Sequence, residues 1–490
     1  MATNRLKTGR RILATLSIIL VTGLFLDFTG TWQSIFGWMA RIQFLPAVLS
    51  LNLIVIVGLI ILTMLFGRLY CSVICPLGIM QDGLAWLGRK AKRNRYSFSK
   101  AKNILRYAML AIMVVALIAG ISSMVAVLAP YSAYGRIANC LLQPVWIWGN
   151  NLLASWAEAH DSYAFYQVEY HSKGYGVITV AVSTLLILAI LAWRNGRTYC
   201  NTICPVGTVL GFFSRFALFR IVIDRSKCVD CKLCSRNCKS ACIDISNHRI
   251  DYSRCVACYD CIGKCNKGAL SFKYVGLSGS KASVEENVSG SRRQFLTAGA
   301  ILGTTAAISA ADKVVDGGLA VIEDKKIPKR KTRIAPPGAV SLRNLHQHCT
   351  ACQLCISACP NGVLRPHTDI ENFMQPESSY ERGYCRPECT RCSDICPTGA
   401  IRPIDIADKS SIQIGHAVWV KENCVPVTDG VECGNCARHC PTGAITMVES
   451  DYDHRIPAVN TEKCIGCGAC ENLCPARPFS AIYVEGHENH

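Results

Sequence analysis

Four long apolar stretches dominate the first part of the chain. They cover residues 12–26, 45–66, 105–128 and 177–193. A helix that crosses a membrane needs about 20 mostly apolar residues, so the second and third stretches are long enough, and the first and fourth are at the short end. Buried core helices give a similar pattern, but four such stretches so close together favour four membrane-spanning helices.

Basic residues are unevenly distributed around these stretches. Lys and Arg cluster before the first, between the second and third, and after the fourth, whereas residues 129–176 contain only Arg136 and Lys173. Because loops rich in Lys and Arg stay in the cytoplasm, we expect both ends of the helical unit there and loops 29–43 and 129–176 on the other side. This orientation explains the net charge of +18 better than a nucleic-acid partner does. No His lies inside the four stretches, which argues against a membrane haem held by two histidines.

Six blocks of cysteines contain most of the 30 Cys. The first two blocks have the C-x2-C-x2-C-x3-C spacing of bacterial ferredoxins, in which the fourth Cys of each run binds the cluster of the other run. We therefore expect two [4Fe–4S] clusters with crossed ligand sets, and an extra thiol, Cys242, that competes with Cys238 as a ligand. The sets are Cys228, Cys231, Cys234 and Cys265 for one cluster, and Cys255, Cys258, Cys261 and Cys238 for the other.

Four further blocks occupy the C-terminal part, and Pro follows the last Cys of each, as in ferredoxins. Structural zinc sites use two ligand pairs instead, so we expect four more [4Fe–4S] clusters, six in all. The blocks pair either as first with second and third with fourth, or as first with fourth and second with third. They are Cys349, Cys352, Cys355 and Cys359; Cys385, Cys389, Cys392 and Cys396; Cys424, Cys433, Cys436 and Cys440; and Cys464, Cys467, Cys470 and Cys474.

A shorter motif, G-R-x-Y-C-x3-C-P-x-G, occurs at residues 67–78 and again at 196–207, each time after an apolar stretch. Two Cys four residues apart share one face of a helix. If the two copies meet, they gather four thiols, which as thiolates suit a further cluster or another soft metal. Thiols that only fill the helix ends, or that form redox disulfides, are the alternative. The four residues are Cys71, Cys75, Cys200 and Cys204.

These features divide the chain into four parts. Residues 1–220 form an α-helical membrane unit, 221–275 a two-cluster ferredoxin domain, 276–330 a linker, and 331–490 a four-cluster domain of the α+β ferredoxin-like class. The linker holds Arg292-Arg293 before a small-residue apolar run that ends at residue 311, which is typical of a twin-arginine export signal. The run is either cleaved or kept as a fifth span.

The four stretches, the paired Cys-x3-Cys-Pro motifs and the two-cluster domain resemble NapH, a membrane ferredoxin-type family of periplasmic nitrate reductase systems. Residues 290–490 resemble the four-cluster NapG and MauM proteins, which are exported with a twin-arginine signal. The resemblance implies a fused bacterial inner-membrane protein with a cytoplasmic N-terminus and first ferredoxin domain, and a periplasmic C-terminal domain. It implies quinol as the electron donor and a periplasmic cytochrome or reductase as the partner.

Quinol oxidation needs a pocket with a proton acceptor near a membrane surface. Candidates near the predicted outer face are Asp27, Arg41, Gln43, Tyr131 and Arg136. The sequence indicates no route for electrons across the roughly 30 Å of apolar membrane between the two groups of clusters. Two other hypotheses stay open: a maturation or repair factor for a periplasmic metalloenzyme, and a cytoplasmic ferredoxin-linked conduit.

Overall fold

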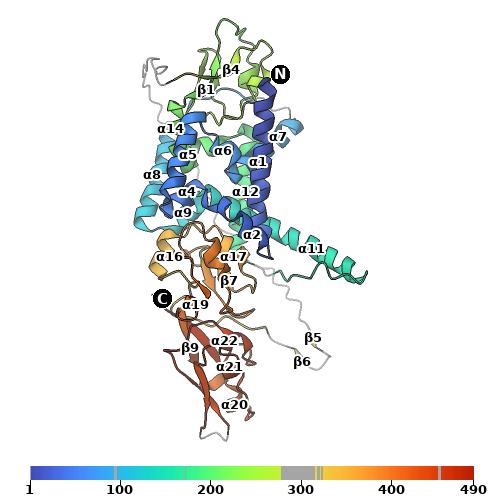
Figure 1. Ribbon diagram of the computed structural model, residues 1–490, viewed down its shortest axis with the longest axis vertical. Helices are drawn as coiled ribbons and strands as arrows, with labels where there is room; N and C mark the ends of the chain where they lie inside the picture. The colour runs from blue at the N-terminus through green and yellow to red at the C-terminus, as the bar shows by residue number, and fades with distance from the viewer. Residues whose placement is uncertain are drawn as a thin grey trace, which may run out of the picture.

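The computed structural model describes residues 2–92, 96–170, 173–276, 315–316, 320–321, 324–450 and 454–490. Three parts lie in line along the longest axis (Figure 1). A small unit with β1 and β4 lies beside the N-terminus, a helical unit forms the middle, and a C-terminal unit lies at the other end. The paired Arg292-Arg293 and the apolar run after them lie outside the described residues.

The helical unit is built around α1 (Ala2–Leu26), α5 (Leu53–Phe66), α8 (Asn103–Ala119) and α12 (Tyr175–Asn195). Among the helices that the structure describes, Arg5–Leu26 and Tyr175–Asn195 are long and apolar enough to cross a membrane. The stretches that looked short in the sequence therefore give the two long helices.

The two stretches that looked longest are each broken. Residues 45–66 form α4 (Phe44–Leu49) and α5, separated by Leu51 with a positive φ of 54° and by Asn52, whose side chain accepts a hydrogen bond from the Val55 N–H. Residues 105–128 form α8 and α9 (Ser122–Leu128), and Gly120 ends α8 in the left-handed conformation. Four full-length spans are not confirmed, because α5 has 14 residues and is about 21 Å long at 1.5 Å per residue.

All four apolar helices nevertheless present exposed apolar side chains on their outward faces. Examples are Leu16 and Ile19 on α1, Ile54 and Ile61 on α5, Ile104 and Ile118 on α8, and Ile187 and Ile190 on α12. Apolar surface of this extent is unusual on a soluble monomer.

Residues 129–176, expected to be a loop on the outer side, are largely helical. They form α10 (Pro130–Ile137), the π-helical turn η1 (Ala138–Leu142) and α11 (Gln143–Glu158), and every residue of α10 is buried. Helix α10 is buried mainly by its neighbours in the helical unit, because it packs against α7 (Pro76–Lys92), α9 and α12, and Gly135 also contacts the C-terminal unit. Helix α11 projects sideways from the helical unit (Figure 1) and exposes Trp146, Trp148 and Trp156.

The small unit follows α13 (Thr198–Thr202) and α14 (Pro205–Phe213). Its first and last strands, β1 (Phe219–Ile223) and β4 (Leu270–Tyr274), pair antiparallel. Between them in the sequence lie α15 (Leu233–Arg236), the short hairpin β2–β3 (Ile243–Asp244 and Arg249–Ile250) and η3 (Ile262–Lys264).

The C-terminal unit consists of short helices and two-stranded antiparallel sheets. Its sheets pair β7 (Leu364–Pro366) with β8 (Pro376–Ser378), β9 (Gly415–Trp419) with β12 (Ile482–Gly486), and β10 (Ile445–Val448) with β11 (Ile456–Val459). Its helices are α16 (Leu342–His348), α17 (Leu354–Ala358), α18 (Arg391–Ile395), α19 (Ile406–Lys409), α20 (Val425–Thr428), α21 (Asn435–Arg438) and α22 (Ala469–Leu473).

The C-terminal unit docks on the end of the helical unit that is remote from the small unit. Arg391 Nη2 donates to the Thr29 carbonyl oxygen at 2.7 Å, and Arg41 Nη2 donates to the Asp394 carbonyl oxygen at 2.6 Å. One continuous apolar core includes Val256 of the small unit, the helical unit, and Cys352 of the C-terminal unit.

Candidate cluster sites and an apolar cavity

The small unit brings its cysteines together in two crossed sets. A cavity of about 170 Å³ is lined by Cys228, Cys231, Cys234 and Cys265. In the second set, burial raises the pKa of Cys261, and the neighbouring Cys258, Cys238 and Cys255 raise it further. Each block thus contributes its last Cys to the other block's set, which is the arrangement that the spacing predicts.

The extra thiol Cys242 is buried between members of the second set. Its Sγ lies 3.5 Å from Cys238 Sγ, and it also contacts Cys255. Cys238 remains the better ligand candidate because it lies beside Cys255, Cys258 and Cys261. Cys242 is placed to hydrogen-bond ligand sulfurs.

The first two C-terminal blocks are also crossed. Burial and neighbouring cysteines, Cys396 among them, raise the pKa of Cys355. Burial likewise raises the pKa of Cys392, which has Cys359 among its neighbours. The two sets are Cys349, Cys352, Cys355 and Cys396, and Cys385, Cys389, Cys392 and Cys359.

The third and fourth blocks form the remaining two sets. A cavity of about 30 Å³ is lined by Cys424, Cys433, Cys436 and Cys474. Burial raises the pKa of Cys467 to about 12, with Cys464 and Cys440 beside it. The geometry therefore pairs first with second and third with fourth. The two pairs meet where the Cys385 N–H donates to the Cys467 carbonyl oxygen at 2.9 Å.

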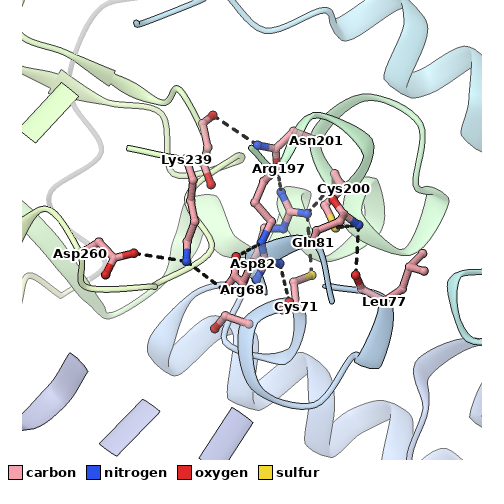
Figure 2. Close-up of polar contacts among 12 residues, drawn as sticks. Arg68, Cys71, Leu77, Gln81, Asp82, Arg197, Cys200, Asn201, Lys239 and Asp260 are labelled. Carbon is pink, nitrogen blue, oxygen red and sulfur yellow. Dashed lines mark hydrogen bonds and ion pairs between the residues drawn. The ribbon is translucent and has the colours of Figure 1, made fainter. Parts of the chain in front are cut away.

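The two Cys-x3-Cys-Pro motifs meet in the helical unit. The first motif forms α6 (Tyr70–Val73) and opens α7 (Pro76–Lys92), and the second forms α13 and opens α14. All four thiols are buried, and the pKa of Cys204 is raised first by burial and then by Cys200, Cys75 and Cys71. Figure 2 shows Cys71 and Cys200 among charged side chains from both copies.

An apolar cavity of about 790 Å³ opens between α1, α2 (Thr31–Phe36), α10, η1 and α12. Its few polar lining atoms include the hydroxyls of Thr22 and Tyr134, which hydrogen-bond each other. Because Thr22 Oγ1 donates to the Ile18 carbonyl oxygen at 2.6 Å, the Tyr134 hydroxyl must donate to Thr22. The Tyr134 oxygen then retains an acceptor site.

This cavity lies close to the first C-terminal cysteine set. Gly135, the residue after Tyr134, touches the Cys352 carbonyl oxygen so closely that a Cβ at this position would clash. Tyr131, one helical turn earlier, has both Cys352 and Cys396 in its electrostatic surroundings. Two neighbouring residues of α10 therefore face the two sites: Tyr134 lines the cavity, and Gly135 contacts the first cysteine set.

Only one of the five residues suggested for a quinol site lines this cavity. Asp27 does, but its carboxylate accepts N–H groups of Thr29, Gly30 and Gln33 and so organises the start of α2.

The other four suggested residues do not line this cavity. Gln43 accepts from the Tyr70 hydroxyl, Arg136 donates to the Ala126 carbonyl oxygen, and Arg41 bonds to the C-terminal unit. Tyr131 is buried with no hydrogen-bond partner for its hydroxyl among the described atoms. Sequence reasoning missed Thr22 and Tyr134. The hydroxyl of Thr22 within the apolar stretch 12–26 was a usable signal, whereas Tyr134 lies outside the apolar stretches and gave none.

Comparisons with known proteins agree with these cysteine sites. A 4Fe-4S binding domain family matches residues 50–95 and 177–224, the segments that carry the two Cys-x3-Cys-Pro motifs, and a 4Fe-4S dicluster domain family matches residues 431–477. No solved structure matches the chain.

Three relatives show the range of similarity. An uncharacterised protein of Methanocaldococcus jannaschii is 35% identical over 94 residues, 19% of this chain and 37% of that protein. The ferredoxin-type protein NapH of Haemophilus influenzae is 26% identical over 176 residues, 36% of this chain and 48% of NapH. The ferredoxin-type protein NapF of Escherichia coli is 29% identical over 165 residues, 32% of this chain and 90% of NapF.

The alignments thus span about a third to a half of the first two relatives. The similarity extends to NapH-type proteins, while fusion to a NapG-type protein has no match of its own among these findings. The matched domains and relatives identify the chain as an iron–sulfur electron-transfer protein related to the NapH-type ferredoxin proteins.

Proposed function

We propose that this chain is a membrane-embedded conduit that takes electrons from quinol and delivers them to an acceptor at its C-terminal unit. The position of the 790 Å³ cavity carries the proposal, because its hydroxyl wall adjoins the helix that contacts Cys352. The volume falls in the range of small-molecule sites, about 300–1,000 Å³. Its apolar lining suits a quinol with a hydrocarbon tail.

The membrane placement rests on the outward apolar faces of α1, α5, α8 and α12. Helix α11, with its exposed Trp side chains, suits the membrane–water interface, where Trp is enriched. Since the small unit adjoins the most basic loops, we assign it to the cytoplasm and the C-terminal unit to the periplasm.

The six crossed cysteine sets are the proposed ligands of six [4Fe–4S] clusters. Each set takes three Cys from one block and the last Cys of the partner block, which is the ferredoxin arrangement. When bound, each cluster takes up and gives back one electron. A structural zinc assignment fits these sets poorly, because structural zinc sites take two ligand pairs, whereas each set here takes three Cys from one block and one from another.

Tyr134 is the proposed partner of the quinol hydroxyl. Its oxygen can accept a hydrogen bond from the substrate while its own proton is held by Thr22 Oγ1. Oxidation of one quinol releases two electrons and two protons. Tyr134 orients the quinol hydroxyl, and the two protons pass to water at the open side of the cavity. Asp27 is occupied by backbone N–H groups and serves to shape the polar end of the cavity.

The test is anaerobic reduction of the purified protein in detergent by a menaquinol analogue, followed by cluster absorbance. We expect Tyr134→Phe to slow reduction about tenfold, the effect of one hydrogen bond worth roughly 1.4 kcal/mol. Dithionite should reduce the variant as it does the parent. Tyr163→Phe, on an exposed loop position, is the matched control. Equal rates for both variants would refute the assignment of Tyr134.

A second donor is favoured by one observation. Cys231 of the small unit is exposed, and Cys228 is partly so, which puts that cluster site within reach of a soluble ferredoxin. If a reduced low-potential ferredoxin reduces the protein rapidly and menaquinol does not, the conduit is ferredoxin-linked.

A further inference from the structure

The two Cys-x3-Cys-Pro motifs form reciprocal hydrogen bonds, in which the arginine of each copy donates to a backbone carbonyl oxygen of the other. Arg68 of the first copy donates from Nη2 to the Cys200 carbonyl oxygen at 2.9 Å. Arg197 of the second copy donates from Nη1 to the Cys71 carbonyl oxygen at 2.6 Å. Equivalent residues therefore make equivalent bonds in both directions, as Figure 2 shows.

The glycine that ends each motif permits this exchange. A Cβ on Gly78 would clash with the Cys71 carbonyl oxygen and lie 2.9 Å from Arg197 Nη1. A Cβ on Gly207 would clash with the Cys200 carbonyl oxygen and lie 2.7 Å from Arg68 Nη2. Both positions need glycine because a carbonyl and a guanidinium occupy the space of a side chain.

Each of the four sulfurs has a hydrogen-bond donor nearby. Gln81 Nε2 lies 3.3 Å from Cys200 Sγ, and Arg68 Nη2 lies 3.8 Å from Cys71 Sγ. The other two sulfurs accept from backbone: the Gly207 N–H lies 3.4 Å from Cys204 Sγ, and the Gly78 N–H bonds to Cys75. Buried free thiols behave as small apolar groups and need no such donors, whereas hydrogen bonds to sulfur accompany iron–sulfur ligation.

The buried positive charge around these four cysteines is not balanced by carboxylates. Arg68 is fully buried, and no carboxylate in the described part of the chain forms an ion pair with it. Its Nε and the Arg197 Nη2 are buried without a hydrogen-bond partner among the described atoms. A buried cation is costly unless an anion compensates it. A four-thiolate [4Fe–4S] centre, with a net charge of about −2 when oxidised, supplies the missing negative charge.

We propose that Cys71, Cys75, Cys200 and Cys204 bind a seventh iron–sulfur cluster inside the helical unit, and that Arg68 and Arg197 compensate its charge. This proposal goes beyond the quinol-linked function and does not depend on it. These four cysteines share one apolar core with Val256 of the small unit and Cys352 of the C-terminal unit. A cluster held there would lie between the two groups of proposed cluster sites and would supply a one-electron carrier.

The test measures metal rather than turnover. We expect the double variant Cys71→Ser/Cys200→Ser to lose about four iron atoms, the content of one cluster, and one electron paramagnetic resonance signal. Cys140→Ser is the matched control, because Cys140 is buried and lies outside all seven sets. Unchanged iron in the double variant would overturn the proposal.

If the double variant does not fold, two other measurements test the proposal: the reduction potentials of Arg68→Gln and the iron content of the parent protein. Since all sulfurs remain in Arg68→Gln, the cluster should still form but at a lower reduction potential, while the other six potentials stay unchanged. Arg68→Lys should restore part of the shift. The parent should contain about 28 iron atoms for seven clusters. About 24 iron atoms, with or without one zinc, would overturn the proposal.

Discussion

Asp82 on α7 holds the small unit against the helical unit. Its carboxylate forms ion pairs with Arg10 at 2.9 Å, Arg197 at 2.6 Å and Lys239 at 2.9 Å. These three cations come from α1, from the second Cys motif and from the small unit, and all are buried. Replacing Asp82 by Asn removes the one charge that they share.

The size of the effect follows from what each cation retains. Lys239 also pairs with Asp260 at 3.2 Å, whereas Arg10 and Arg197 have no second carboxylate among the described residues. Removing one partner of a buried ion pair costs about 3–5 kcal/mol. We take the lower end, about 3 kcal/mol, which raises local opening of this interface about 100-fold.

Hydrogen–deuterium exchange in detergent measures that opening. The reporter is the Arg197 N–H, which donates to the Lys239 carbonyl oxygen at 2.8 Å across the interface. Asp224→Asn is the control, because Asp224 pairs only with an exposed Lys227 on the surface of the small unit. If Asp82→Asn exchanges no faster than this control, the ion-pair network does not hold the two units together.

The pH dependence of the same interface has a definite sign. Although burial alone would raise the pKa of Asp82, Arg197, Lys239 and Arg10 hold that pKa well below its usual range. The stabilisation is therefore fully present above the ordinary aspartate pKa of about 3.9 and is lost progressively as pH falls below it. Exchange at the Arg197 N–H should not change between neutral pH and about pH 5, after correction for intrinsic exchange.

Two further predictions concern the cysteine sites. Cys396→Ser should abolish the cluster signal of the first C-terminal block and leave that of the second, as measured by iron content and low-temperature resonance spectra; loss of the second block's signal instead would contradict the crossed assignment. Gly207→Ala should lower thermal stability, since overpacking costs about 1–3 kcal/mol, and should reduce the iron content. The control is Gly83→Ala, at a helical position with no atom within 4 Å of the new Cβ, which should raise stability by up to about 1 kcal/mol. A similar loss of stability and iron in both variants would show that the clash at Gly207 is not the cause.

Local spacing was enough to predict which cysteines meet inside a pair of blocks. The crossed sets of the small unit follow from the ferredoxin spacing. The spacing of the Cys-x3-Cys-Pro motifs placed two cysteines on each helix face, but the meeting of the two motifs was only a condition of the prediction, and the structure supplies it. The pairing of the four C-terminal blocks did not follow, because all four have nearly the same signature. Contacts between blocks, such as Cys385 with Cys467, depend on the whole unit.

The helical unit shows why apolar length alone misled. Stretches 45–66 and 105–128 are continuous in hydropathy, yet Asn52 caps one helix and Gly120 ends another. Conversely, α10 carries Ser132, Tyr134 and Arg136 and was expected to belong to a loop, but packing against α7, α9 and α12 buries all of it. Burial by helices from other parts of the sequence leaves no local pattern.

The reciprocal hydrogen bonds of Arg68 and Arg197 make each half of the helical unit depend on the other half. Each copy of the motif carries an arginine whose acceptor lies in the other copy. A chain with a single copy would leave its arginine without that acceptor and would hold half of a four-cysteine site. Such a chain would need a second identical subunit to complete the site. Because both halves lie in one chain here, a substitution of Arg68 or Arg197 disturbs the opposite motif as well as its own.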